Sequence, residues 1–280
     1  MTDYVAKPSH GAAWVTGASS GIGRALAVRL AGEGFTVAAT ARGEDDLAEL
    51  AGETSTLAGH VVAMPGDVTD ADDMARIVDT IERRHGALAL AVLNAGVYIP
   101  VHGEALELAD FERSFAVNLG GVVNALVPAV DAMKRARRGQ IAVVASATGY
   151  GGLPTGAAYG ATKAGLINMA ESLKFDFDKL GIKIQVVNPG FVDTPATRRN
   201  AFAMPDLISA DEAASQIVQG LKGANFEISF PRRFITIMKI MRLLPYAAYF
   251  SILNRRTGWS RRPLIADTDD ESEIQGQGVD

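Results

Sequence analysis

A tyrosine and a lysine stand four residues apart in the segment "TGAAYGATKAG", at Tyr159 and Lys163. Positions i and i+4 of a helix share one face, so the phenol and the amine can point into one cleft. A free tyrosine has a pKa near 10, and a proton donor or acceptor works best with a pKa near the working pH. A nearby ammonium favours the phenolate form, and so does a positively charged nicotinamide ring. The pair therefore suits acid–base chemistry between an alcohol and a carbonyl, and Lys163 could also reach ribose hydroxyls.

A serine strengthens this interpretation, because a Y-x-x-x-K pair alone also occurs on ordinary solvated helix faces. Ser146 ends the apolar segment "QIAVVAS" (140–146), thirteen residues before the tyrosine. The carboxyl ends of parallel strands border the ligand crevice of an α/β sheet. A serine hydroxyl at such an end can donate a hydrogen bond to a substrate oxygen on which charge develops.

The elements that must position these residues alternate along the chain. Short apolar segments, typical of strands, alternate with amphipathic ones, typical of helices, which predicts βαβ crossovers. Nearly continuous apolar strands indicate a sheet that helices cover on both faces. The fold class predicted is α/β, a doubly wound, Rossmann-type, mostly parallel seven-stranded sheet with a C-terminal helical extension. Strands are expected within 12–16, 35–41, 60–68, 88–96, 140–146, 182–190 and 226–230, and helices within 21–34, 45–52, 70–86, 110–137, 156–179 and 209–223.

The first strand leads into a glycine-rich turn, "VTGASSGIGR" (15–24). Gly17, Gly21 and Gly23 let the backbone turn tightly and approach a ligand. The helix that follows offers unpaired N–H groups and a positive dipole end to a phosphate. Glycines alone would fit any turn, but this is the first βα turn of an alternating sheet, where dinucleotides bind.

Arg42 stands where the second strand ends, in "ATARGEDD". An acidic residue there accepts a free ribose 2′-hydroxyl, whereas an arginine accommodates a 2′-phosphate. The alternative is a solvated loop arginine for which Glu44, Asp45 and Asp46 compete. We expect NADP as the cofactor, with NAD possible.

The composition restricts the class of protein further. The chain has 280 residues, 48% hydrophobic, 21% charged and with a net charge of -5, which fits a globular protein and gives no basic field for nucleic acid. The absence of cysteine excludes disulfides and a thiol nucleophile, and the four single histidines show no metal-ligand spacing, so we expect no metal site. No apolar leader follows Met1, so we expect no signal peptide and a cytoplasmic location.

Together these motifs closely resemble those of the short-chain dehydrogenase/reductase family, over residues 10 to 230. "TGASSGIG" (16–23), "NAG" (94–96) and "NPGFVDT" (188–194) match its cofactor segments, and Asn118, Ser146, Tyr159 and Lys163 match its catalytic tetrad. With Arg42, the resemblance implies a cofactor site formed by Gly17, Ser19, Ser20, Gly21, Ile22, Gly23, Arg42, Asp67, Val68, Asn94, Ala95, Gly96, Tyr159, Lys163, Pro189, Gly190, Val192 and Thr194.

The resemblance also implies roles for the tetrad. Tyr159 would exchange the alcohol proton, Lys163 would lower its pKa and bind the nicotinamide ribose, and Ser146 would orient the carbonyl. Asn118 would hold a water that links Lys163 to solvent, although a structural asparagine bonded to the backbone is the alternative. Asn94 would mainly steady the sheet.

The chain departs from the family after Phe230. Residues 231–264 read as two basic, apolar helices split at Pro245, too interrupted by charge and proline to span a membrane. We expect this extension to pack as a lid or oligomer contact, with one face buried at Ile237, Met238, Met241 and Leu244; the alternative is an element on an anionic membrane. Residues 265–280 are acidic and predict a disordered tail.

The function predicted is NADP(H)-dependent interconversion of a ketone or aldehyde and an alcohol, with an apolar small-molecule substrate. The mostly apolar loop 194–209 and the extension hint that this substrate is bulky. Alternatives are a membrane-surface lipid, retinoid or steroid dehydrogenase, a dehydration or epimerisation on the same scaffold, and a non-catalytic NADP-sensing regulator. A regulator would be expected to lose the tyrosine or the lysine, and both are present. A homodimer or homotetramer is expected, without nucleic acid.

Overall fold

The computed structural model describes residues 3–197 and 204–264. Its main element is a seven-stranded, wholly parallel sheet in the order β3-β2-β1-β4-β5-β6-β9. The order reverses direction between β1 and β4, which is where doubly wound sheets bind ligands. The predicted fold class is confirmed. The strands are β1 (Ala12–Thr16), β2 (Thr36–Thr40), β3 (His60–Ala63), β4 (Leu88–Leu93), β5 (Gly139–Val144), β6 (Ile182–Pro189) and β9 (Glu227–Phe230).

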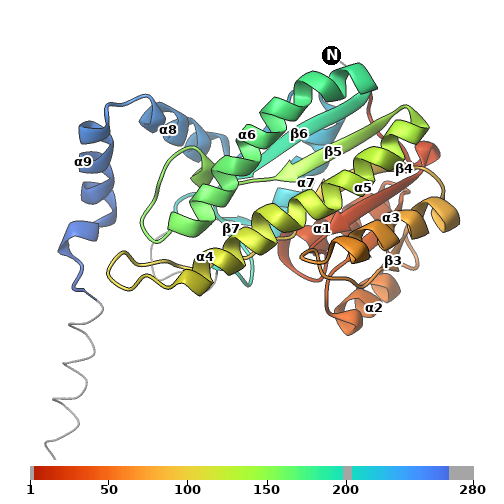
Figure 1. Cartoon of the computed structure of the whole chain (residues 1–280), viewed down its shortest axis with the longest axis horizontal. Helices are drawn as coiled ribbons and strands as arrows, with labels where there is room; N and C mark the ends of the chain where they lie inside the picture. Colours follow the sequence, from red (N-terminus) through yellow and green to blue (C-terminus); the bar gives the residue numbers. More distant parts are fainter. Residues whose placement is uncertain (1–2, 198–203, 265–280) are drawn as a thin grey trace, which may run out of the picture.

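Helices cover both faces of this sheet (Figure 1). One apolar core joins the sheet to α3, α5 and α6, and a second joins the opposite face to α1, α2 and α7. Because both faces are covered, β1, β4, β5 and β6 are buried along their whole length, as their continuous apolar sequences predict. The helices are α1 (Gly21–Gly32), α2 (Glu44–Glu53), α3 (Ala71–His85), α5 (Gly121–Ala136), α6 (Ala157–Leu180) and α7 (Ala210–Lys222).

A long helical stretch was expected from 110 to 137, and the structure divides it. Helix α4 (Leu108–Phe115) passes through a single π-helical turn (Ala116–Gly120) into α5. By length and composition the stretch Leu108–Ala136 could cross a membrane, but α5 buries its apolar side against the sheet and α3. This packing accounts for part of the apolar sequence of α5.

The chain beyond β9 forms the two helices expected on either side of Pro245. Helix α8 (Arg232–Arg242) and helix α9 (Tyr246–Thr257) lie at one end of the molecule, with a 3-10 turn (Trp259–Arg261) after them (Figure 1). The predicted division at residue 230 falls between β9 and α8. The tail predicted at 265–280 lies outside the described residues.

The buried face of α8 differs in part from the one predicted. Met238 and Met241 are buried as expected, together with Ile235. Ile237, however, is 49% exposed, because it borders a cleft instead of the core. Leu244 is only half-buried, since α8 has already ended at Arg242. A small parallel pair that the sequence did not predict, β7 (Val192–Asp193) and β8 (Ile208–Ser209), flanks the same cleft.

Candidate active site

A cleft of about 1610 Å³ lies at the carboxyl ends of the strands. The loops after β1, β2, β3, β4, β5 and β6 all contribute to its walls, and α8 and α9 close one end. This is the edge at which doubly wound sheets bind ligands. All the residues predicted for the cofactor site except Gly23 line it, and so do Ser146, Tyr159 and Lys163.

The glycine turn after β1 has the backbone that its sequence predicts. Gly17 and Gly21 have φ of 67° and 53°, in the left-handed region that favours glycine. Ser19, Ser20 and Ile22 line the cleft beside them, and α1 begins at Gly21, so its first N–H groups open toward the cleft. A phosphate at this helix end would meet hydrogen-bond donors and a favourable dipole.

Gly23 has a structural role behind this turn. A Cβ at this position would lie 2.2 Å from the Gly17 carbonyl oxygen and 2.6 Å from the Asn94 amide nitrogen. Only glycine therefore allows α1 to pack this closely against the loop after β1. Gly23 does not line the cleft, so it supports the site without facing a ligand.

Asn94 ties the loop after β4 to the end of β1. Its side-chain amide donates to the carbonyl oxygens of Thr16 at 3.0 Å and Gly17 at 3.3 Å. The Thr16 hydroxyl in turn accepts from the backbone N–H groups of Asn94 and Ala95. These bonds fit the sheet-steadying role that the family resemblance implies. They leave Ala95 and Gly96 on the wall of the cleft.

Arg42 lies at the cofactor end of the cleft and is exposed. Within the described part of the chain its guanidinium has no hydrogen bond or ion pair, so the acidic residues at 44–46 do not engage it. Arg24, by contrast, is held by Glu49 and Glu53 at 2.9 Å and 2.7 Å. Arg42 is therefore free to meet a ligand, whereas Arg24 is already paired.

Asp67 and Val68 follow β3 and form the next part of the wall. The Asp67 carboxylate accepts from the backbone N–H and the hydroxyl of Thr69, at 2.9 Å and 2.8 Å, which fixes the turn. The carbonyl of Val68 accepts from the amide of Asn124 on α5 at 2.9 Å. This part of the wall is thus held by bonds within its own turn and by a bond to α5.

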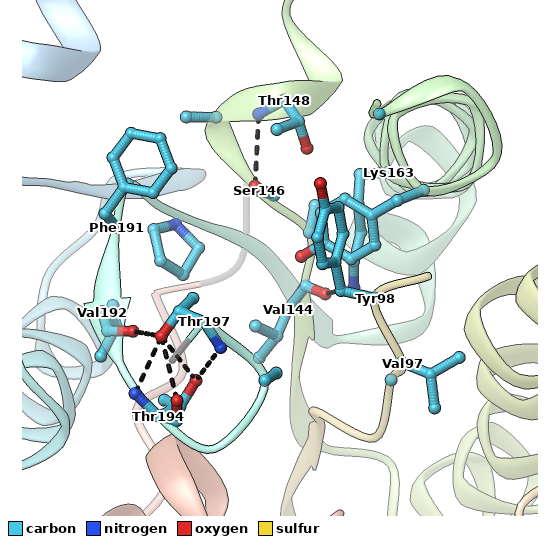
Figure 2. A pocket seen from close by; sticks show the side chains of 18 of the residues that line it. Val97, Tyr98, Val144, Ser146, Thr148, Lys163, Phe191, Val192, Thr194 and Thr197 are labelled. Carbon is cyan, nitrogen blue, oxygen red and sulfur yellow. Dashed lines mark hydrogen bonds between the residues drawn. The ribbon is translucent and has the colours of Figure 1, made fainter. Parts of the chain in front are cut away.

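The segment after β6 forms the opposite wall. Pro189, Gly190, Val192 and Thr194 line the cleft, and Gly190 donates from its N–H to Phe230 at 2.7 Å. The Thr194 side chain lies against the glycine turn, because a Cβ on Gly21 would come within 3.0 Å of it. In Figure 2, Thr194 and Thr197 form a hydrogen-bonded group across the pocket from Ser146, Lys163 and Tyr98.

The three polar residues of the predicted tetrad that face the cleft come from two elements. Ser146 follows β5 and caps a short 3-10 turn, where its hydroxyl accepts from the Thr148 N–H at 3.2 Å. Tyr159 and Lys163 project from the first two turns of α6. The Lys163 nitrogen lies 5.4 Å from the centre of the Tyr159 ring and donates to the Val144 carbonyl at 2.8 Å.

The electrostatics of this pair differ from the expectation. Burial raises the pKa of Tyr159 to about 12, and hydrogen bonding by Ser146 only partly opposes the rise. Burial lowers the pKa of Lys163 to about 8. Desolvation thus dominates, Tyr98 adds to the rise, and the lowering of the tyrosine pKa expected from Lys163 is not seen. Burial therefore shifts both groups toward their neutral forms: at pH 7 the phenol is neutral, whereas Lys163 is still mostly protonated.

Asn118 occupies the π-helical turn between α4 and α5 and is fully buried. Its carboxamide oxygen accepts from the Val97 N–H at 2.8 Å, and its nitrogen donates to the Val97 carbonyl at 2.9 Å and the Thr162 hydroxyl at 3.2 Å. The side chain therefore fits the structural alternative, a residue bonded to the backbone. It does not line the cleft, although a Cβ on Gly96 would approach both Asn118 and Lys163.

Two residues that sequence reasoning missed complete the tyrosine's surroundings. The Tyr98 ring packs edge-on against the Tyr159 ring, with centroids 5.2 Å apart. Its hydroxyl shares a 2.8 Å hydrogen bond with Thr155, a residue held at φ 59°. Tyr98 follows the "NAG" segment by two positions, and this proximity was the only signal in the sequence.

The far end of the cleft is mainly apolar. Helices α8 and α9 and the segments after β5 and β6 form it, with arginines among the apolar side chains. The lining residues here include Leu153, Phe191, Phe234, Ile237, Met238, Met241, Ile252, Leu253, Arg233 and Arg256.

Comparison with known proteins identifies the same family that the motifs of this site resemble. The model of the short chain dehydrogenase family matches residues 11–203. The chain belongs to the short-chain dehydrogenase family. Over 241 residues it is 33% identical to an uncharacterized oxidoreductase from Myxococcus xanthus, covering 86% of this chain and 95% of that protein. It is 32% identical to the 3-oxoacyl-acyl-carrier-protein reductase FabG of Thermotoga maritima, covering 77% of this chain and 85% of the relative.

Solved structures show the same likeness. A 3-ketoacyl-ACP reductase from Sinorhizobium meliloti superposes with a TM-score of 0.70 at 27% identity, covering 78% of this chain and 96% of that one. An alcohol dehydrogenase from Thermococcus sibiricus, in complex with 5-hydroxy-NADP, superposes with a TM-score of 0.72 at 27% identity. The match covers 78% of this chain and 95% of that one. The protein is thus an oxidoreductase of this family, acting on alcohol or carbonyl groups.

Proposed function

We propose that the protein is an NADP(H)-dependent reductase of a bulky apolar ketone or aldehyde, or the corresponding alcohol dehydrogenase. One observation carries the proposal: Tyr159, Lys163 and Ser146 line a single cleft that is continuous with the glycine turn after β1. Acid–base residues and a phosphate-binding turn in one cavity are the parts that this reaction needs.

The residues of the glycine turn, with Asn94, Gly190 and Thr194, would hold a dinucleotide. Their fit rests on the cradle itself, since side chains on Gly17 or Gly21 would close it. A bound nicotinamide supplies or accepts the hydride. Arg42 would hold a 2′-phosphate, because it is exposed at the cleft and, among the described residues, unpaired. The relative in complex with 5-hydroxy-NADP supports this preference.

The protein's own groups account for the proton and the orientation of the substrate. Tyr159 donates its phenolic proton to the carbonyl oxygen during reduction and accepts it during oxidation. Ser146 donates a hydrogen bond to the same oxygen and stabilises the charge that develops there. Lys163, with a pKa near 8, can hold or release a proton behind the phenol at neutral pH.

The raised pKa of Tyr159 keeps the phenol protonated at neutral pH, as a donor in reduction must be, but it also makes the phenol a weaker acid. A phenol that stays protonated up to pH 12 is available as a donor at neutral pH. For oxidation its pKa must fall, and a positive charge beside the phenol has that effect. Lys163, which is still mostly protonated at pH 7, places one such charge beside the ring, and a bound oxidised nicotinamide would add another.

A panel of carbonyl compounds tests this proposal. The absorbance of NADPH and of NADH is followed with ketones and aldehydes of increasing apolar bulk, and with alcohols and oxidised cofactor. We expect turnover with NADPH and a bulky ketone. A protein that binds NADPH but turns over no compound in either direction would instead support the non-catalytic regulator. The cytoplasmic location and the homodimer or homotetramer stay predictions.

A further inference from the structure

Helices α8 and α9 carry exposed apolar side chains next to their shared turn at Pro245. Leu243 is 84% exposed and Tyr246 67%, and Ile240 and Phe250 are more than half exposed. The Tyr246 and Phe250 rings stack with centroids 6.0 Å apart. We call these four residues the α8–α9 apolar patch. Single exposed apolar residues are ordinary, whereas a group on one projecting turn marks an interaction surface.

The charged residues of the segment that carries this patch have one sign. Residues 231–264 contain eight Lys and Arg and no Asp or Glu, in a chain whose net charge is -5. Lys239 pairs with Glu227, and Arg262 pairs with Glu104. The other six have no ion pair within the described part of the chain; they are Arg232, Arg233, Arg242, Arg255, Arg256 and Arg261.

The same two helices also form the end of the cleft. Ile237, Met238 and Met241 on α8, and Ile252 and Leu253 on α9, line it. Tyr249 anchors α9 to the body, because its hydroxyl donates to the Gly152 carbonyl at 2.8 Å. One set of side chains on the two helices therefore lines the cleft, while the patch residues are exposed. Figure 1 shows α9 beyond the edge of the sheet and its covering helices.

We propose that the α8–α9 apolar patch and the unpaired arginines of the same segment dock the protein on an anionic lipid surface. Exposed aromatic and aliphatic side chains enter the boundary of a bilayer, and basic residues beside them are attracted to anionic headgroups. Docking in this way would bring the apolar end of the cleft close to the bilayer, where apolar carbonyl compounds concentrate.

A second copy of the chain fits the same surface less well. A two-fold contact sets a surface against the same surface of the partner, so the basic segment of one copy would lie near the basic segment of the other. Like charges brought together without acidic partners repel one another. An anionic bilayer instead offers the opposite charge across the whole surface.

The acidic tail carries the opposite charge. Residues 265–280 contain six Asp and Glu and no Lys or Arg. If attraction to lipid drives docking, these charges weaken it. Replacing Asp269, Asp270 and Glu271 by the corresponding amides in the full chain should therefore strengthen vesicle binding. Weaker binding after this change would contradict the proposal.

The main experiment is cosedimentation of the full-length protein with vesicles. Vesicles of phosphatidylcholine alone are compared with vesicles that contain one third phosphatidylglycerol. We expect binding to the anionic vesicles at low salt and at least tenfold weaker binding in 0.5 M NaCl, where the Debye length falls well below ~10 Å. A protein that ignores anionic vesicles at low salt would overturn the proposal. The readout needs no turnover, so it is independent of the proposed function.

Paired variants assign the binding to this surface. Leu243→Ser with Phe250→Ser removes apolar patch residues, and the matched control is Phe175→Ser, which alters a side chain on α6 that is 76% exposed. Arg232→Glu with Arg242→Glu reverses two charges, and the control is Lys7→Glu with Arg84→Glu. We expect each α8–α9 variant to lose at least tenfold in vesicle affinity and both controls to bind as the wild type does.

Two further measurements keep these variants interpretable. Thermal unfolding shows whether each variant is folded, and light scattering reports its oligomeric state. If the patch variants dissociate an oligomer while vesicle binding does not change, the surface belongs to a second copy and the proposal is wrong. Equal losses in the α8–α9 variants and their controls would also overturn it.

Discussion

The side-chain nitrogen of Lys163 lies 5.4 Å from the centre of the Tyr159 ring and donates its hydrogen bond to the Val144 carbonyl. Its bond is thus made to the backbone of β5, with the phenol beside it. The lysine is therefore bonded to the sheet while it lies over the Tyr159 ring. The position of the Lys163 side chain is set by its place on α6, by its hydrogen bond to β5 and by the buried surroundings.

Replacing the tyrosine tests the proton path directly. Tyr159→Phe keeps the ring and its edge-on contact with Tyr98 but removes the hydroxyl. We expect kcat to fall about 100-fold or more, the usual contribution of a positioned acid or base, while NADPH affinity stays nearly intact. Turnover and calorimetric titration measure the two quantities. A variant that retains a tenth of the wild-type kcat, a barrier change of about 1.4 kcal/mol, would exclude Tyr159 as the acid.

The lowered pKa of Lys163 predicts a pH-dependent stability. Its pKa falls from 10.5 to about 8 in the fold, so between these values the unfolded chain binds a proton that the folded chain has released. Stability therefore rises with pH through this window, and the cost of burying the charge is fully present below pH 8. Relative to Lys163→Met, the wild type should gain up to about 3 kcal/mol between pH 7 and 10.5.

Chemical denaturation of both proteins, without cofactor, at several pH values in this range measures that difference. The comparison cancels the other titrating groups, including Tyr159, which is present in both chains. A difference that does not change with pH would show that Lys163 titrates at its ordinary value. A difference that falls as pH rises would mean that the ammonium is stabilised in the fold.

The glycine turn provides a matched pair of substitutions in one helix. Gly23→Ala places a Cβ 2.2 Å from the Gly17 carbonyl oxygen, so α1 must shift away from the loop. We expect a loss of about 1–3 kcal/mol in unfolding free energy and weaker NADPH binding. Gly32→Ala meets no atom within 4 Å and should stabilise the helix by up to about 1 kcal/mol. Thermal melts with and without NADPH test both, and equal behaviour would contradict the packing argument.

How much the sequence could predict depended on the range of the interactions. Strands such as β1 and β5 could be located because burial on both faces requires continuous apolar residues. The glycine turn was predictable because its backbone needs glycine at Gly17 and Gly21. These features are local, so a few consecutive residues are enough to predict each of them.

Features that depend on contacts between distant segments could not be predicted in this way. The π-helical turn at Asn118 depends on bonds to Val97, and the contact of Tyr98 with Tyr159 joins the loop after β4 to α6. The pKa of Tyr159 required the depth of burial, which spacing does not give. The sequence could thus name Ser146, Tyr159 and Lys163, which the structure brings to one cleft, but it could not give their electrostatics.

Arg42 provides the test of cofactor choice. Because it is exposed at the cleft and, among the described residues, unpaired, a 2′-phosphate should find it available. We expect NADPH to bind more tightly than NADH, and Arg42→Ala to remove about 1.5–3 kcal/mol of that preference. Arg24→Ala is the control, since its guanidinium already pairs with Glu49 and Glu53. Equal affinities for the two cofactors in the wild type would refute the NADP assignment.

The last prediction concerns α8 as the wall of the substrate site. Ile237 lines the cleft at 49% exposure, whereas Ile240, one turn further along the same helix, is 56% exposed and does not line it. Both can be shortened to alanine with little cost to the core. Ile237→Ala should raise KM for a bulky apolar ketone several-fold, because apolar contact with the substrate is lost, and should change KM for a small ketone less. Ile240→Ala should change neither, and NADPH affinity should stay constant in both variants. If Ile237→Ala leaves KM unchanged for every substrate, α8 does not contact the substrate, and its apolar residues serve packing alone.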